Sequence, residues 1–200
     1  MNRKNIFWIT SIILFFSFFI FLFFKSNPEK ELIERKKQLE LTKKENIEVI
    51  EERMESSNLI EDVSYSAKDA KGNEYFLKAS EGTIDQNESN YIFLKSVKAN
   101  ISLKKYKIIE ISSSFGKYNI NNYDTIFSKN VIITYLDNKI TGDYLDFSWD
   151  KNLMIISRDV VLKNNKSSLQ ADVIEVNIKT RDIKIFMYEE NKKINIKSLN

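Results

Sequence analysis

Few side chains in this 200-residue chain are suited to covalent, metal or acid–base chemistry. There is no cysteine and no histidine, which leaves out thiol nucleophiles, imidazole bases and the commonest zinc ligands. Asp143 and Asp146, three residues apart, are a candidate pair of catalytic carboxylates. They alternate with Leu145 and Phe147, however, which is the pattern of a strand whose polar side chains face water. We therefore predict that the chain is not an enzyme.

Metal, cofactor and nucleic-acid sites are not predicted either. The stretch from Asp69 to Gly72 and the Asn/Asp-rich turns carry too few ligands for a calcium loop. A phosphate loop and a nucleophile elbow are also absent from the sequence. The net charge of +3 comes from 31 basic and 28 acidic residues, and this mixed charge does not indicate a nucleic-acid partner. We expect no cofactor and no metal.

The apolar residues follow an internal repeat, and any function must be positioned by it. A small residue recurs at intervals of 34, 29 and 29 residues, at Ala79, Ser113, Gly142 and Ala171. Each copy begins two residues earlier on an apolar side chain, at Leu77, Ile111, Ile140 and Leu169. A period of this length indicates stacked supersecondary units.

Each copy reads as two strands joined by a polar turn, because apolar residues alternate with polar ones on either side of the turn. The alternation changes phase just after the small residue, which predicts a bulge or bend there. Residues 58–200 are therefore predicted to form an all-β domain of two facing antiparallel sheets. The side chains expected on the inner faces are Leu77, Ile84, Phe93, Val97, Tyr118, Ile120, Phe127, Val131, Phe147, Trp149, Ile156, Val160, Val176 and Ile178. Whether they fill a closed core or line an open trough is left undecided by the pattern.

Residues 1–25 are predicted to be a transmembrane anchor. The stretch 6–24 carries no charge, and as a helix it spans about 28 Å, enough to cross a hydrocarbon core. A cleaved signal peptide is the alternative, but residues 25–28 offer no small-x-small cleavage site. Lys and Arg lie on both sides of the stretch, so their distribution does not decide the orientation.

Residues 26–57 are rich in both charges and are predicted to be a helical linker. Glu31 and Arg35 have the acid-before-base spacing that favours a solvated helix. Ile47, Ile50 and Met54 form a thin apolar stripe. A spacer, a partner-binding helix and a solvated linker without a partner all agree with this pattern.

The complete plan resembles the LptC-type lipopolysaccharide export proteins of the LptA/LptC/OstA-N β-jelly-roll group. The resemblance rests on the anchor, the glycine turn at 69–73, the Tyr75-x-Leu77-x-Ala79 strand and the repeats. Three copies share a basic residue followed two places later by valine, at Lys95/Val97, Lys129/Val131 and Arg158/Val160. Two features depart from the group: its second glycine has no counterpart here, because the last copy, residues 169–187, contains no glycine, and the linker is charged and helical.

The resemblance implies an open β-jelly roll, or β-taco, anchored by one span in the bacterial inner membrane, with its C-terminal domain in the periplasm. Such a protein receives lipopolysaccharide from an ABC transporter complex and passes it to a periplasmic β-jelly-roll bridge protein. The inner-face residues above would then bind acyl chains. Neighbouring β-domains would dock at exposed strand edges, with Gly72, Ile183, Ile185 and Met187 as partner-binding candidates.

Two alternatives stay open at this point. The recurring basic residues Lys95, Lys129 and Arg158 are either contacts for lipid phosphates or solvated strand residues that discourage edge aggregation. The chain as a whole is either a lipid conduit or a membrane-anchored scaffolding β-repeat protein that transports no lipid. The second alternative predicts a dry, filled interior.

Overall fold

The computed structural model describes residues 28–55, 59–84, 89–104, 106–189 and 191–199. The predicted anchor, residues 1–25, lies outside these ranges. Within them, no helix combines the length and the apolar character needed to span a bilayer. Contacts divide the chain into two compact units, Met1–Thr42 and Lys43–Asn200.

The charged linker forms a single helix, α2, from Pro28 to Glu55, as the sequence predicts. Pro28 suits the first helical position because its missing N–H would have no partner there. The division between the two units falls inside this helix, after Thr42. The second half of α2 therefore belongs to the same compact unit as the strands.

Ten strands follow the helix, and every paired strand runs antiparallel to its neighbour. They are β1 (Ile60–Lys68), β2 (Glu74–Ile84), β3 (Tyr91–Ser102), β4 (Ile109–Asn119), β5 (Thr125–Tyr135), β6 (Asn138–Ser148), β7 (Leu153–Lys163), β8 (Ser167–Asn177), β9 (Ile183–Phe186) and β10 (Asn195–Ser198). The order is β1 to β8 in sequence and then β10, while β9 also pairs with β8. The strands thus pair into one continuous sheet, whereas the sequence predicted two facing sheets.

The long strands bend near their middles. Ser96 in β3, Lys129 and Asn130 in β5, and Arg158 and Asp159 in β7 all have left-handed backbone angles, with φ between 52° and 69°. The pairing register shifts at the same level in β4 to β8. In β4 and β6 the shifts fall at Ser113 and Gly142, and the left-handed residues lie at the same level on the neighbouring strands β3, β5 and β7. The bend predicted at the small residue is confirmed.

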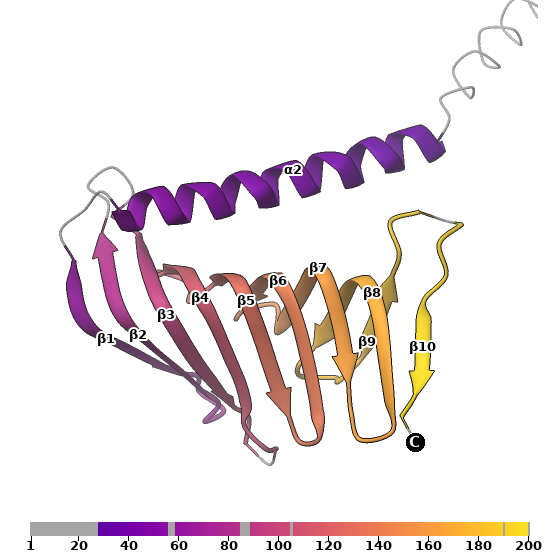
Figure 1. Ribbon diagram of the computed structural model, residues 1–200. Helices are drawn as coiled ribbons and strands as arrows, with labels where there is room; N and C mark the ends of the chain where they lie inside the picture. The colour runs from indigo at the N-terminus through magenta and orange to yellow at the C-terminus, as the bar shows by residue number, and fades with distance from the viewer. Residues whose placement is uncertain (1–27, 56–58, 85–88, 105, 190, 200) are drawn as a thin grey trace, which may run out of the picture. The chain divides into compact units, whose positions relative to one another are not determined.

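The sheet folds along this line of bends into two facing layers (Figure 1). Tyr75 in β2 and Phe147 in β6 have ring centroids 5.1 Å apart, although four strand spacings in a flat sheet amount to about 19 Å. Layer A is formed by the N-terminal halves of β2, β4, β6 and β8 and the C-terminal halves of β1, β3, β5 and β7, and it ends at β10. Layer B comprises the other half-strands and ends at β9. The turns of the two layers face each other at the open side, opposite the bends, which we call the mouth.

The second half of α2 covers the outer face of layer B. Ile50 of the helix and Phe93 of β3 are both fully buried against each other, with Phe115 and Ile126 packed around them. The Lys129 ammonium lies 2.6 Å from the Glu51 carboxylate and joins the bend of β5 to the helix. The apolar stripe predicted in the linker therefore binds the chain's own sheet, through Ile47 and Ile50.

Candidate functional site

The space between the layers is lined by rows of apolar side chains that run across the sheet. One row follows the strand register through Gly82, Leu94, Gly116, Phe127, Leu145, Ile156, Ile174 and Ile185. Of the predicted inner-face residues, nine are buried in this interior: Leu77, Val97, Tyr118, Phe127, Val131, Phe147, Ile156, Val160 and Ile178. Trp149 and Val176 are partly buried against them. Their inward orientation is confirmed, while their contact with lipid stays a prediction.

Three of the predicted residues behave differently. Phe93 lies on the outer face of layer B beneath α2, so its inward orientation was wrong. The pairs Phe127/Val131 and Ile156/Val160 are four residues apart and both face inward, because β5 and β7 each carry an extra residue at the bend. β3 lacks that residue, so the inward partner of Val97 is Leu94, three residues earlier.

The prediction that Ile84 and Ile120 are buried on the inner faces was also wrong, because they are 47% and 40% exposed. Ile84 pairs with the buried Ile92, but it is the last residue of β2, and β1 pairs only as far as Gly82. Ile120 lies one residue beyond the end of β4, in a turn. A side chain at a strand end can point to the same side as the inward residues of its strand and still be exposed, because no neighbouring strand covers it.

An aromatic cluster fills the interior between β1 and β6. Tyr75 lies 5.9 Å from Trp149 and 6.5 Å from Tyr118, measured between ring centroids, and Tyr65 lies 5.0 Å from Tyr118. The Tyr75 hydroxyl shares a buried 2.9 Å hydrogen bond with Thr125 Oγ1. Burial raises the pKa of Tyr118 to about 12 and raises that of Tyr75 further. This part of the interior is a packed core.

An apolar groove opens at the mouth, between β4 and β8. We call it the mouth groove; it has a volume of about 180 Å³ and very little polar surface. Layer A contributes Leu103, Tyr106, Lys107, Ile109, Ile133, Tyr135, Asn138, Ile140 and Leu162, and layer B contributes Met154, Val176, Asn177, Ile178, Arg181 and Ile183. The arrangement offers hydrocarbon a place between the layers that is reached from solvent.

The rim of the mouth groove carries cations from both layers. Lys107 lies in the β3–β4 loop of layer A, and Arg181 lies in the β8–β9 turn of layer B. The Arg181 guanidinium carbon is 5.1 Å from the centre of the Tyr106 ring, a cation–π contact that joins the two layers. Sequence reasoning identified neither Tyr106 nor Arg181 as a site residue.

The recurring basic residues of the repeat lie on the side opposite the mouth. Lys95 pairs with Glu81 at 3.1 Å, and Lys129 pairs with Glu51. Arg158 is half-buried at the bend of β7. These positions are far from the mouth groove along each strand, so they do not form its rim.

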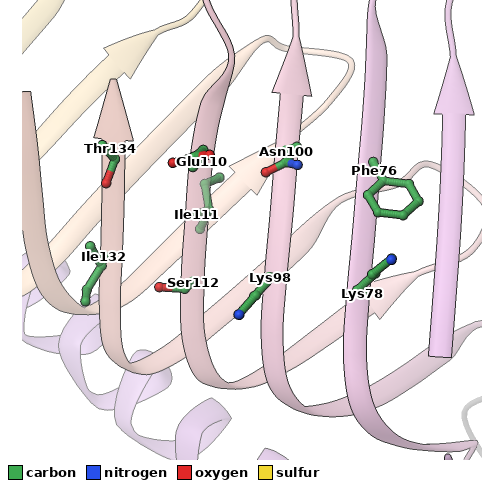
Figure 2. A pocket seen from close by; sticks show the side chains of 9 residues that line it. All are labelled: Phe76, Lys78, Lys98, Asn100, Glu110, Ile111, Ser112, Ile132 and Thr134. Atoms are coloured by element: carbon green, nitrogen blue, oxygen red, sulfur yellow. The ribbon is translucent and has the colours of Figure 1, made fainter. Parts of the chain in front are cut away.

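The outer face of layer A has a larger hollow of about 460 Å³ with mixed polarity (Figure 2). Its side chains come from the neighbouring strands β2 to β5 and are Phe76, Lys78, Lys98, Asn100, Glu110, Ile111, Ser112, Ile132 and Thr134. Lys78 lies over the Phe76 ring at 5.3 Å. Because its wall alternates charged and apolar groups, this hollow suits water better than hydrocarbon.

The candidate carboxylates do not act as a pair. Asp146 lies on the outer face of layer B and Asp143 lies at the bend beside Gly142. Burial raises the pKa of the Asp146 carboxyl, and repulsion from Asp124 raises it further. The residues that the structure describes contain no group of three or more acidic side chains placed to hold a metal ion.

The partner-binding candidates lie at two ends of the sheet. Gly72, with φ of +81°, closes the predicted turn between β1 and β2, where its N–H donates to the Asp69 carbonyl. Ile183, which is 53% exposed, and Ile185 belong to β9, and Met187 follows that strand. β9 is the edge of layer B, and β10 is the edge of layer A. Partner binding at these residues stays a prediction.

An apolar groove between two layers of a folded antiparallel sheet offers a place where hydrocarbon can be sheltered from water. A family model described as lipopolysaccharide-assembly, LptC-related, matches residues 19–187. The chain belongs to this family, as the resemblance in its sequence indicated. Its members are non-enzymatic transport proteins, and membership supports a role in lipopolysaccharide transport.

Among solved structures, the chain is similar to that of LptH from Pseudomonas aeruginosa, described as the LptA-homologous periplasmic component of the conserved lipopolysaccharide transport device. It is 6% identical to this chain, with 61% of this chain and 92% of that chain covered and a TM-score of 0.47. No curated protein matches the chain.

Proposed function

We propose that this chain is the inner-membrane-anchored subunit of the lipopolysaccharide transport machinery. In this proposal it receives lipopolysaccharide from an inner-membrane ABC transporter complex and passes it to a periplasmic β-jelly-roll bridge protein. Residues 1–25 serve as the anchor, and the strands lie in the periplasm. Family membership supports the transport role, and the mouth groove is the observation that carries the assignment of the site.

The mechanism is passive. Acyl chains leave water for the apolar walls of the mouth groove, while the sugars stay outside in solvent. Energy for transport comes from the ABC transporter, so no residue of this chain undergoes a chemical step and no cofactor is required. The predicted inner-face residues provide the surface along which the acyl chains move.

Transfer to the next protein uses a free sheet edge. Backbone groups on the open side of an edge strand can pair with a strand of a neighbouring β-domain. β9 is the edge of layer B and contributes Ile183 to the mouth groove, so a bridge protein that pairs with β9 continues the groove. We therefore place the bridge protein at β9 rather than at β10.

Photocrosslinking in the living cell tests the lipid site. A photoreactive amino acid replaces Ile140, which lines the mouth groove, and in a matched variant it replaces the neighbouring Thr141, on the opposite face of β6. We expect a lipopolysaccharide adduct at Ile140 and none at Thr141. Equal adducts at both positions, or none at Ile140 in a folded variant, would contradict the assignment of the groove.

The same method tests the docking edge. Ile183 in β9 and Ile196 in β10 are 53% and 66% exposed, so both tolerate replacement. We expect Ile183 to crosslink to the bridge protein and Ile196 not to. If neither position yields a protein adduct and Ile140 yields no lipid adduct, the scaffolding alternative becomes the better explanation.

A further inference from the structure

Two turns of layer B have the same backbone hydrogen bonds and share three of their six residues. They are residues 119–124, NINNYD, and residues 177–182, NIKTRD. In each, the N–H of the first residue donates to the carbonyl of the sixth at 2.9 Å, and the N–H of the fifth donates back to the first at 2.9 or 2.7 Å. The fifth residue is left-handed in both, with φ of 64° at Tyr123 and 68° at Arg181.

The equivalent position therefore holds an aromatic ring in one turn and a cation in the other. Tyr123 packs against the apolar interior, whereas Arg181 is exposed at the rim of the mouth groove. The turn geometry does not require arginine, since it forms equally well around Tyr123. Among the residues that the structure describes, no carboxylate forms an ion pair with Arg181, whose contact is the face of Tyr106.

We propose that Arg181, assisted by Lys107, binds the phosphate of a lipid headgroup whose acyl chain occupies the mouth groove. The proposal deepens, and rests on, the lipid-transport function proposed above. A groove with apolar walls and a cationic rim is complementary to an anionic amphiphile. The planar guanidinium donates two parallel hydrogen bonds to phosphate oxygens. Arginine therefore binds a phosphate more strongly than it binds the face of an aromatic ring.

The contact with Tyr106 gives the site a closed state. It joins a loop of layer A to a turn of layer B across the mouth. A dry cavity of about 150 Å³ holds a molecule of benzene's size, so the mouth groove at about 180 Å³ admits only a short length of acyl chain. When a phosphate takes Arg181 from Tyr106, the two layers lose this link and can move apart around a longer chain.

Lipid titrations of the purified full-length chain in nonionic detergent test the proposal. The photoreactive residue at Ile140 reports occupancy, and the probes are lipid A, the phosphorylated acyl part of lipopolysaccharide, and lipid A stripped of its phosphates. We expect Arg181→Gln to raise the lipid A concentration at half-saturation about tenfold, which is the loss of affinity expected for one charge-assisted contact. The variant should bind the stripped lipid at least as tightly as the unsubstituted chain does, because it loses the closing contact with Tyr106 but no phosphate contact.

Lys179→Gln is the matched control, because it removes the same charge from an exposed position of the same turn outside the groove. We expect it to change the lipid A concentration at half-saturation by less than about twofold, because a surface charge is screened by salt. Arg181→Lys should recover part of the affinity, because it keeps the charge and loses the planar fork. Tyr106→Leu should bind lipid A at least as tightly as the unaltered chain, since it frees Arg181.

The outcomes separate this inference from the proposed function. If the chain that carries only the photoreactive residue at position 140 crosslinks to neither lipid, the lipid site itself is wrong. If it binds both lipids equally, or if Arg181→Gln behaves as Lys179→Gln does, the lipid site stands and the phosphate assignment is overturned. The comparison of the two lipids on the unaltered chain requires no substitution in the turn, so it decides the question even if Arg181→Gln does not fold.

Discussion

The contact between α2 and layer B provides a prediction whose magnitude follows from the structure. Ile50 is fully buried against Phe93 and is the centre of a small apolar cluster separate from the main interior. Truncating a buried isoleucine to alanine generally costs about 2–5 kcal/mol. Because this cluster contains only two fully buried side chains among the described residues, we expect Ile50→Ala to cost about 2 kcal/mol, at the low end of that range.

Two polar contacts between the helix and the sheet are weak. The Lys129–Glu51 pair has side chains that are 47% and 28% exposed, and ion pairs of this kind contribute about 0–1 kcal/mol. The hydrogen bond from Asn46 Nδ2 to the Tyr144 hydroxyl is long, at 3.4 Å. Undocking of residues 43–55 in Ile50→Ala should therefore become about thirtyfold more frequent.

Hydrogen–deuterium exchange followed by mass spectrometry measures how often residues 43–55 undock from the sheet. We expect faster exchange in the peptides of α2 from residue 43 onward and unchanged exchange in β4 to β8, whose core does not include Ile50. Glu52→Ala, at an exposed position of the same helix, is the control and should leave both regions unchanged. If the central strands exchange faster by the same factor as the helix, the helix and the sheet unfold as one cooperative unit and the reasoning is refuted.

Three further predictions concern the sheet. Tyr75→Phe removes the buried hydrogen bond to Thr125 and should lower the free energy of unfolding by about 1 kcal/mol in urea titrations; an unchanged midpoint would show that the bond contributes nothing. Gly142→Ala places a Cβ 2.9 Å from a methyl group and 3.2 Å from two carbonyl oxygens of β7, so urea titration should show a loss of about 1–3 kcal/mol, and a neutral result would mean that the bend adapts. Asp146→Asn should raise the melting temperature at pH 7, because burial and Asp124 disfavour the charged form. The raised pKa means that the charged carboxylate destabilises the folded state, and this destabilisation disappears below the unfolded-state pKa near 4, where the carboxyl is protonated in both states. The gain in melting temperature should therefore vanish as the pH falls to about 4. A gain that is the same at every pH would argue against a charge effect.

The periodic parts of the sheet could be predicted from the sequence, because the repeat sets the phase of each strand. Phe127, Val131, Ile156 and Val160 face inward as expected. Phe93 does not, because its orientation depends on whether the strand carries one residue more or less at its bend, which composition does not reveal. The single folded sheet also escaped prediction, since the alternation is the same whether the two faces belong to one sheet or to two.

The mouth groove could not be predicted in the same way. Tyr106 and Arg181 are far apart in the sequence, in loops that meet only because the sheet folds over. A signal was nevertheless present, because the turn NINNYD recurs as NIKTRD with a cation in place of tyrosine. Ile120 and Ile178 are equivalent in these turns, yet they are 40% and 3% exposed. Residues at equivalent positions of two similar turns thus differ in burial through the neighbours that the fold gives them.

The strand order has a consequence for how the chain folds. From β1 to β8 every strand pairs with the one that precedes it, so each new pairing closes only a short loop and the contact order is low for an all-β protein. Pairing can begin at the N-terminal hairpin and propagate strand by strand toward β8. β10 pairs with β8 across the intervening β9, so it adds last. Until it does, the layer A edge of β8 stays open, and a chaperone or a partner strand has a limited time in which to bind there.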